Sequence, residues 1–307
     1  MPPTTPPPAD IIRIVTLGRL GFEGRKSDGC EALLSQPKRL AVLLYLLLSQ
    51  RDGSVSRDQV IGVFWPESDA TRARNALRQA LSFIRTCLGA DAVVGVGAQG
   101  LAVAPRLSCD AVRFEAQLDT GRREDALRLY GGELLLGVHV AGAGGFEEWL
   151  DHRRLYLRQR AVRAAWELSA ECEASGDGSG AAFWGKRALA LSPFSEIEVQ
   201  RLLKILHRVG DYAGVIRAFN GLQQAMLSEF GIGPSDETAQ MAAAARAQLR
   251  AAQLPADAAV GARRSGGDRR VGQRRRSQKP WHGIERRTQP DRRSSERRSG
   301  KDRRAVN

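Results

Sequence analysis

Residues 71–88 constrain the fold most strongly, because their apolar side chains recur at spacings of three and four, which predicts one amphipathic helix. The apolar stripe consists of Ala73, Ala76, Leu77, Ala80, Leu81, Ile84 and Leu88. Two further helical segments precede it, at residues 35–53 and 56–66. Two β-prone runs around a glycine-rich turn follow it at residues 93–105, as in a β-hairpin. Three helices followed by a hairpin is the element order of a winged helix-turn-helix.

Terminal signals delimit the two preceding helices. In the first, Ser35 is the expected N-cap, Pro37 occupies the first turn, and Gly53 lies beyond the end. This helix is nearly all apolar, so we predict that it is buried. In the second, Ser56 is the expected N-cap and Pro66 ends the helix.

The glycine-rich turn at residues 95–100 matches the GxGxxG pattern of dinucleotide-binding loops. That pattern requires a helix directly afterwards, whereas here the β-prone sequence LAVAP follows. We therefore interpret the turn as the wing, formed by Gly97, Ala98, Gln99 and Gly100. Short strands are also predicted within residues 11–24, where β-branched and apolar residues are interrupted by glycines.

The polar face of the 71–88 helix is a candidate DNA-contacting surface. A helix fits the major groove, where Arg forms two hydrogen bonds with guanine and Asn or Gln forms two with adenine. The residues predicted to contact bases are Thr71, Arg72, Arg74, Asn75, Arg78, Gln79 and Ser82. The residues predicted to contact phosphates are Lys38, Arg39, Arg57 and Arg85. The alternative interpretation is a solvated helix surface with no ligand, although no acidic residue interrupts this face.

From Gly121 onward the apolar periodicity is almost entirely helical. Gly176-Asp177 and Gly210-Asp211 lie 34 residues apart, which is the tetratricopeptide period, and each pair separates two helical segments. Small or apolar residues recur at matching offsets, such as Ala182 with Ile216. Stacked helical pairs bury a common core and present a concave surface to partners. We therefore predict two repeats, with an irregular one before them.

The net charge of +13 is concentrated at the C-terminal end of the sequence. Residues 261–307 contain 15 Arg and 2 Lys against 5 acidic residues, which gives +12 and leaves +1 for residues 1–260. Overall basicity is therefore no argument for DNA binding by the folded body. Because residues 253–307 have few apolar side chains, we predict a disordered Arg-rich tail there, and a disordered lead-in at residues 1–10.

Patterns for catalysis or cofactor binding are absent from the sequence. The four histidines and four cysteines are dispersed, with no CxxC, so no metal site is expected. No GxxxxGK[ST] loop occurs. The longest apolar run, residues 40–48, is far shorter than the roughly 20 residues that cross a bilayer, and no secretory signal is recognisable. We expect a cytoplasmic, nucleoid-associated protein that is not an enzyme and has no cofactor and no membrane partner.

Several segments together resemble the SARP-type bacterial transcriptional activators. The resemblance covers roughly residues 11–250 and is carried by SQPKRLAVLLYL, VSRDQVIGVFWPESDATRARNALRQALSFIRTCLG, FEEWLDHRRLYLRQRA, KRALALSPFSE and LSEFGIGPSDET. It implies a mostly α protein with an OmpR-like winged helix-turn-helix (α+β) at residues 11–107. An all-α, tetratricopeptide-like bacterial transcriptional activator domain follows at residues 108–252. The Arg-rich tail is no part of the family pattern.

The resemblance also implies a function. Members of this family bind direct repeats in promoter DNA, often as a side-by-side pair, and help to recruit RNA polymerase. By matching position, Arg74, Asn75, Arg78 and Ser82 fall on the recognition helix, and residues 97–100 fall on the wing. We therefore expect a sequence-specific transcription regulator whose partners are double-stranded DNA, RNA polymerase and a second copy on DNA. Two alternatives are a helical-repeat protein-interaction scaffold and an RNA-associated protein that acts through its basic tail.

Overall fold

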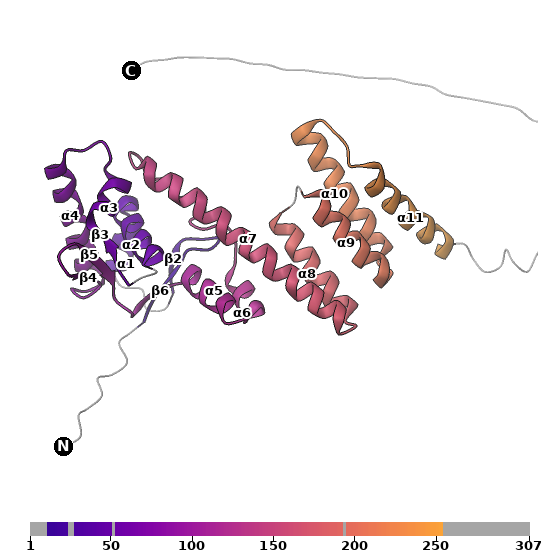
Figure 1. Ribbon diagram of the computed structural model, residues 1–307, viewed down its shortest axis with the longest axis horizontal. Coiled ribbons are helices and arrows are strands. Elements are labelled where there is room, and N and C mark those ends of the chain that lie inside the picture. Colours follow the sequence, from indigo (N-terminus) through magenta and orange to yellow (C-terminus); the bar gives the residue numbers. More distant parts are fainter. Residues whose placement is uncertain (1–10, 24–27, 51–52, 193–194, 254–307) are drawn as a thin grey trace, which may run out of the picture. The chain divides into compact units, whose positions relative to one another are not determined.

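The N-terminal part of the chain folds as the predicted winged helix. The computed structural model describes residues 11–23, 28–50, 53–192 and 195–253. The three predicted helices are α2 (Pro37–Ser49), α3 (Arg57–Phe64) and α4 (Ala70–Leu88), and the wing is the antiparallel pair β4 (Val93–Val96) and β5 (Gly100–Val103) (Figure 1). The prediction of a mostly α fold that begins with a winged helix is confirmed.

Burial in the winged helix follows the predicted apolar pattern. Every residue of α2 from Leu40 to Leu48 is buried, as expected for a helix without a polar face. The stripe of α4 is buried as well, except for Ala76, which is half-buried. The larger side chains of this stripe, Leu77, Leu81, Ile84 and Leu88, pack with Val60 and Phe64 of α3 in one core.

One of the two predicted N-caps is confirmed and the other is wrong. The Ser56 hydroxyl accepts a hydrogen bond from the amide of Gln59 at 3.0 Å and caps α3. Gln36, not Ser35, precedes α2. Ser35 instead donates its hydroxyl to the Ala32 carbonyl at 2.7 Å, at the end of a short helix that the sequence did not indicate, α1 (Asp28–Leu34).

Two small sheets complete the winged helix. In the first, β1 (Ile12–Val15) lies between antiparallel β2 (Gly21–Glu23) and parallel β6 (Leu107–Cys109), with Ile12 opposite Leu107. In the second, the short strand β3 (Val55–Ser56) adds to the wing beside β5. The chain that leaves the wing therefore returns to its first strand before the helical domain begins.

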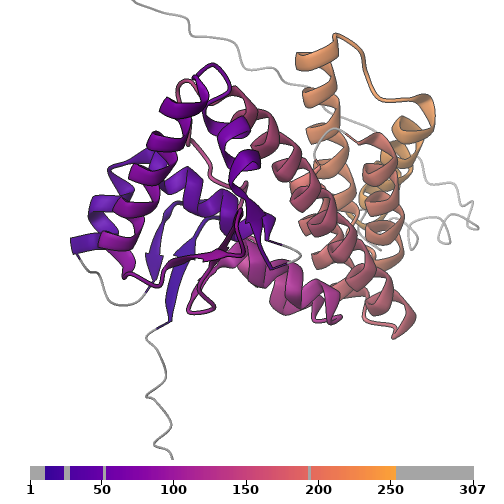
Figure 2. The same cartoon turned by 60° about the vertical axis from the view of Figure 1, so that its left-hand side comes forward.

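The remainder of the described chain is helical, as predicted. Its helices are α5 (Asp110–Asp119), α6 (Arg123–Leu129), α7 (Gly144–Ala174), α8 (Gly178–Leu191), α9 (Glu196–Val209), α10 (Tyr212–Phe230) and α11 (Asp236–Gln253). Successive helices from α7 onward pack side by side (Figure 2). No helix in the described part of the chain is long and apolar enough to cross a membrane.

The predicted 34-residue repeat corresponds to repeated geometry. Gly176 and Gly210 both have positive φ, +80° and +78°, at the ends of α7 and α9. Asp177 and Asp211 cap the next helices by accepting hydrogen bonds from amides three residues on, at 2.9 and 2.7 Å. Each Gly-Asp pair therefore ends one helix in the left-handed conformation that glycine favours and begins the next.

Aromatic side chains join the winged helix to α7. The rings of Phe64 and Phe146 are stacked with centroids 5.0 Å apart, and Trp149 lies 4.8 Å from Tyr45. Gly145 lies so close to the backbone of Val63 that an added Cβ would be 3.1 Å from the Val63 carbonyl oxygen. The first turns of α7 are therefore packed directly against α3. The N-terminal lead-in and residues 254–307 of the predicted Arg-rich tail lie outside the described residues, and Gln253, predicted as the first residue of the tail, is the last residue of α11.

Candidate nucleic-acid interface

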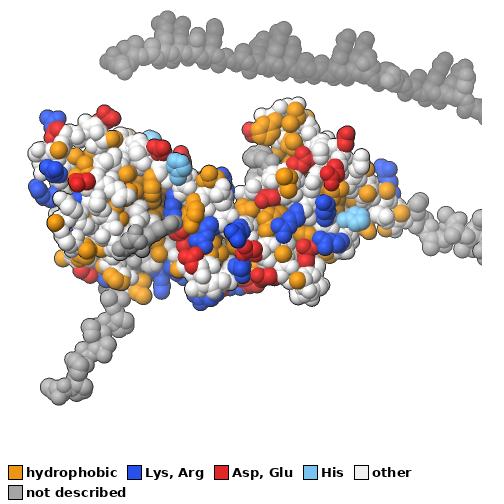
Figure 3. All heavy atoms as spheres, in the orientation of Figure 1, with side chains coloured by type: hydrophobic (Ala, Val, Ile, Leu, Met, Phe, Trp, Pro, Cys, Tyr) orange, Lys and Arg blue, Asp and Glu red, His pale blue; other side chains and the backbone are white. Residues whose placement is uncertain are grey.

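The outward face of α4 carries all seven residues predicted to contact bases, and each of them is exposed. They are Thr71, Arg72, Arg74, Asn75, Arg78, Gln79 and Ser82. The helix contains four Arg and no acidic residue. Lys and Arg side chains are visible along the edge of the molecule where Figure 1 labels α4 (Figure 3). The structure therefore presents these side chains to solvent on one continuous helix surface.

Asp69, which was not among the predicted functional residues, fixes the start of this helix. Its carboxylate accepts hydrogen bonds from the amides of Thr71 and Arg72 at 3.0 and 2.9 Å. The negative charge at a helix N-terminus is also favourable to the helix dipole. An Asp directly before the amphipathic segment was the available signal.

Three of the predicted base-contacting side chains, Arg72, Asn75 and Arg78, have partners on α4 or at its N-cap. Arg72 forms an ion pair with Asp69 at 3.1 Å, and Arg78 donates to the Asn75 side-chain oxygen at 2.9 Å. The Arg72 and Asp69 side chains are 86% and 55% exposed. Because exposed pairs of this kind are worth about 0–1 kcal/mol, they exchange readily for contacts with a ligand.

The four predicted phosphate-contacting residues occupy different environments. The backbone amide of Arg57 donates to the Gln99 carbonyl at 2.9 Å, which places the start of α3 beside the wing turn. The Arg39 guanidinium lies 4.2 Å above the ring of Phe83 on α4. Both residues are half-buried and lie next to the candidate surface.

The other two make hydrogen bonds inside the molecule. Lys38 donates its ammonium to the Gly142 carbonyl at 3.3 Å and lies 5.4 Å from the Trp65 ring, and burial lowers the pKa of Lys38. The Nε of Arg85 donates to the Val93 carbonyl at 2.8 Å, which joins the end of α4 to the first strand of the wing. The geometry gives both residues a structural role, and their phosphate contacts remain predictions.

The wing turn has the geometry of a tight hairpin. Gly97 has φ +57°, and residues 97–99 are exposed. Val96 pairs with Gly100 across the turn, where an added Cβ on Gly100 would lie 2.5 Å from the Val96 carbonyl oxygen. The GxGxxG pattern is thus followed by strand β5, not by a helix. In the outer strand, Val94 and Val96 are 42% and 45% exposed.

No group of three or more His, Cys, Asp or Glu side chains that could hold a metal ion occurs among the residues that the structure describes.

Comparisons with known proteins agree with this architecture. Residues 109–246 match the family described as Bacterial transcriptional activator domain. The chain is 25% identical over 253 residues to the Regulatory protein AfsR of Streptomyces griseus, a match that covers 78% of this chain and 25% of AfsR. It is 28% identical over 151 residues to the Transcriptional regulatory protein EmbR of Mycobacterium tuberculosis, covering 49% of this chain and 36% of EmbR. The chain thus spans well under two thirds of these relatives.

The fold is similar to that of a solved structure. The structure of Mycobacterium tuberculosis EmbR in complex with low affinity phosphopeptide superimposes with a TM-score of 0.51 and 18% identity. The match covers 82% of this chain and 70% of that chain, so it includes both the winged helix and the helical domain.

Proposed function

We propose that this chain, a transcription regulator of the SARP type, recognises promoter DNA by placing α4 in the major groove. The exposed, Arg-rich and acid-free face of α4 is the observation that supports this proposal. Under this proposal, residues 11–107 bind DNA and residues 108–252 mediate regulation, in the cytoplasm at the nucleoid.

Base recognition rests on the side chains at the centre of the α4 face. Arg74 and Arg78 have the guanidinium geometry for two hydrogen bonds to guanine, and Asn75 has the amide geometry for two to adenine. Each such pair discriminates against a wrong base by about 1–3 kcal/mol. Arg39 and Arg57 flank this surface and contact phosphates, which fixes the register of the helix without reading sequence. The wing turn at residues 97–100 approaches the neighbouring groove.

The resemblance to SARP-type activators extends the proposal to partners. Two copies bind adjacent direct repeats, and the helical domain contacts RNA polymerase. In a reconstituted transcription assay, the full chain should raise the yield from a promoter that carries the selected site and leave a promoter with a scrambled site unchanged. Equal yields from both promoters would remove activation from the proposal.

Site selection from a random DNA library, followed by anisotropy titrations of the full chain, tests DNA recognition directly. Arg78→Ala should weaken binding to the selected site by about 1–3 kcal/mol, or about 5- to 150-fold, and change affinity for scrambled DNA much less. Arg57→Ala should weaken both DNAs by a similar factor and reduce the salt slope by about 1.

Arg217→Ala is the matched control, because Arg217 is 70% exposed on α10 and its loss changes the net charge equally. It should leave the affinity within twofold. If Arg74→Ala and Arg78→Ala bind the selected site as tightly as this control does, α4 does not recognise the DNA. Tight binding without sequence preference would instead favour the protein-interaction scaffold.

A further inference from the structure

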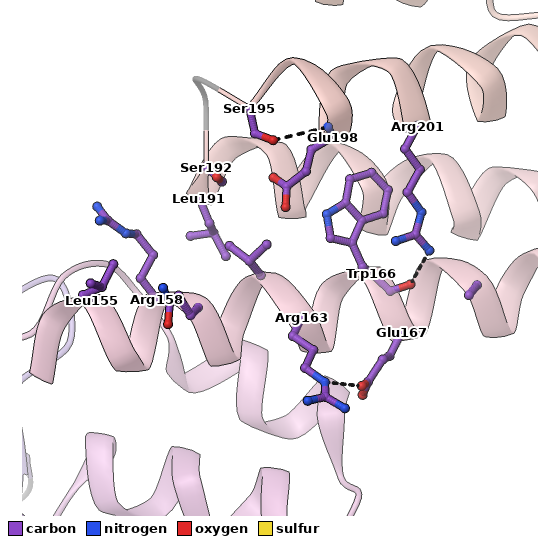
Figure 4. A pocket seen from close by; sticks show the side chains of 13 residues that line it. Leu155, Arg158, Arg163, Trp166, Glu167, Leu191, Ser192, Ser195, Glu198 and Arg201 are labelled. Carbon is purple, nitrogen blue, oxygen red and sulfur yellow. Dashed lines mark hydrogen bonds and ion pairs between the residues drawn. The ribbon is translucent and has the colours of Figure 1, made fainter. Parts of the chain in front are cut away.

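A cavity of about 860 Å³ lies in the helical domain between α7 and the start of α9 (Figure 4). Its volume is within the range of about 300–1,000 Å³ that is typical of small-molecule sites. Leu155, Val162 and Leu191 contribute apolar walls, and Trp166 contributes an indole ring. The cavity is separate from the candidate DNA-contacting surface on α4.

Two polar atoms in the wall of this cavity have no hydrogen-bond partner. The Trp166 side chain is buried, at 6% exposure, and its Nε1 is an unpaired donor. The Glu198 Oε2 is a buried, unpaired acceptor. In Figure 4 the indole nitrogen and the carboxylate point toward the same space. Because a buried polar group without a partner costs about 1–3 kcal/mol, these two atoms favour a ligand that offers both an acceptor and a donor.

A guanidinium lies against the same indole. The Arg201 guanidinium carbon is 4.3 Å from the centre of the Trp166 ring, and Arg201 donates to the Trp166 carbonyl at 3.5 Å. Within the described residues, Arg201 has no carboxylate at ion-pair distance. The other two arginines in the same wall are paired, Arg158 with Glu133 at 3.3 Å and Arg163 with Glu167 at 2.8 Å. Arg201 is therefore the cation that remains available to an anionic ligand.

We propose that this cavity binds a flat aromatic acid that carries a hydroxyl group. The carboxylate of the ligand accepts hydrogen bonds from Arg201 and Trp166 Nε1, and its hydroxyl donates to Glu198 Oε2. The aromatic body lies against Val162 and Leu191. A ligand there contacts α7, the helix whose first turns pack on α3 of the winged helix.

Calorimetry with 4-hydroxy-2-naphthoate, whose hydroxyl is too far from its own carboxylate to donate to it, tests the site on the full chain. We expect saturable one-site binding that Arg201→Gln weakens at least tenfold and Trp166→Phe weakens at least fivefold. The neutral analogue 1-naphthol, which lacks the carboxylate, should bind weakly and be insensitive to Arg201→Gln. Arg250→Gln, on the exposed end of α11, is the charge-matched control and should bind like the wild type.

The indole N–H signals of the tryptophans provide a second readout. The signal that disappears in Trp166→Phe identifies Trp166, and it should shift on addition of 4-hydroxy-2-naphthoate in the wild type and in Arg250→Gln. Absence of saturable binding up to millimolar probe would overturn the proposal. So would equal affinity in wild type, Arg201→Gln and Trp166→Phe, or binding that leaves the Trp166 signal in place.

Discussion

Asp110 holds the first strand of the protein against the start of the helical domain, and its replacement should destabilise the whole fold. The carboxylate is buried, at 8% exposure, at the first residue of α5. It accepts hydrogen bonds from the amides of Thr16 and Leu17 at 2.8 and 3.0 Å and from the Thr16 hydroxyl at 2.5 Å. These bonds join residues more than 90 positions apart in the sequence.

The size of the effect follows from the donors that would lose their partner. In Asp110→Ala, the buried amides of Thr16 and Leu17 remain without an acceptor, at about 1–3 kcal/mol each. We therefore expect the free energy of unfolding to fall by roughly 2–6 kcal/mol. The free energy of unfolding of Asp110→Asn should lie between those of the wild type and Asp110→Ala. The asparagine oxygen still accepts the hydrogen bonds from Thr16, whereas its NH₂ group faces the Leu17 amide and cannot accept one.

Urea denaturation followed by far-ultraviolet circular dichroism measures these differences. Asp119→Ala is the matched control, since it also removes a carboxylate from α5. The Asp119 side chain is 66% exposed and pairs with Arg160 at 2.6 Å. An exposed pair of this kind is worth at most about 1 kcal/mol. If Asp110→Ala destabilises the protein no more than Asp119→Ala does, the buried carboxylate is not what secures β1.

Two further outcomes are expected. Two hydrogen bonds from Arg106, at 2.8 and 2.7 Å, lower the pKa of the Asp91 carboxyl from 3.8 to about 2. Because the pKa is lower in the folded protein, the pair stabilises the fold above about pH 4, and this contribution is lost as the pH falls toward 2. An NMR titration of the Asp91 carboxyl should show its pKa returning toward 3.8 in Arg106→Gln, and an unchanged value would contradict the assignment. Gly210→Ala should destabilise the protein by about 1 kcal/mol, because Gly210 has φ +78°, which alanine rarely adopts. Gly221→Ala should stabilise the protein by about 0.5–1 kcal/mol, because Gly221 lies inside α10 with open space around it. Thermal unfolding compares the two variants, and changes in Tm of the same sign would refute the argument from backbone conformation.

Local sequence signals predicted the elements on which the proposed function depends. The spacing of apolar residues in 71–88 determined which side of α4 is buried and which is exposed, because helix periodicity is a property of neighbouring residues. The Ser56 cap and the two Gly-Asp pairs are equally local, since each acts on amides within three residues. The exposed, Arg-rich face of α4 and the repeat were therefore predictable from the sequence alone.

Contacts between distant segments required the tertiary structure. Nothing in the pattern around Leu107 indicates that it pairs with Ile12, and no local signal marks Asp110 as the acceptor for Thr16. The same holds for the hydrogen bond from Arg85 to the Val93 carbonyl, which no local signal around Arg85 indicates. Apolar periodicity shows which side of a helix or strand is buried, but not which residues bury it. Contacts between residues far apart in the sequence, and the cavity beside Trp166, therefore depend on how the helices and strands pack.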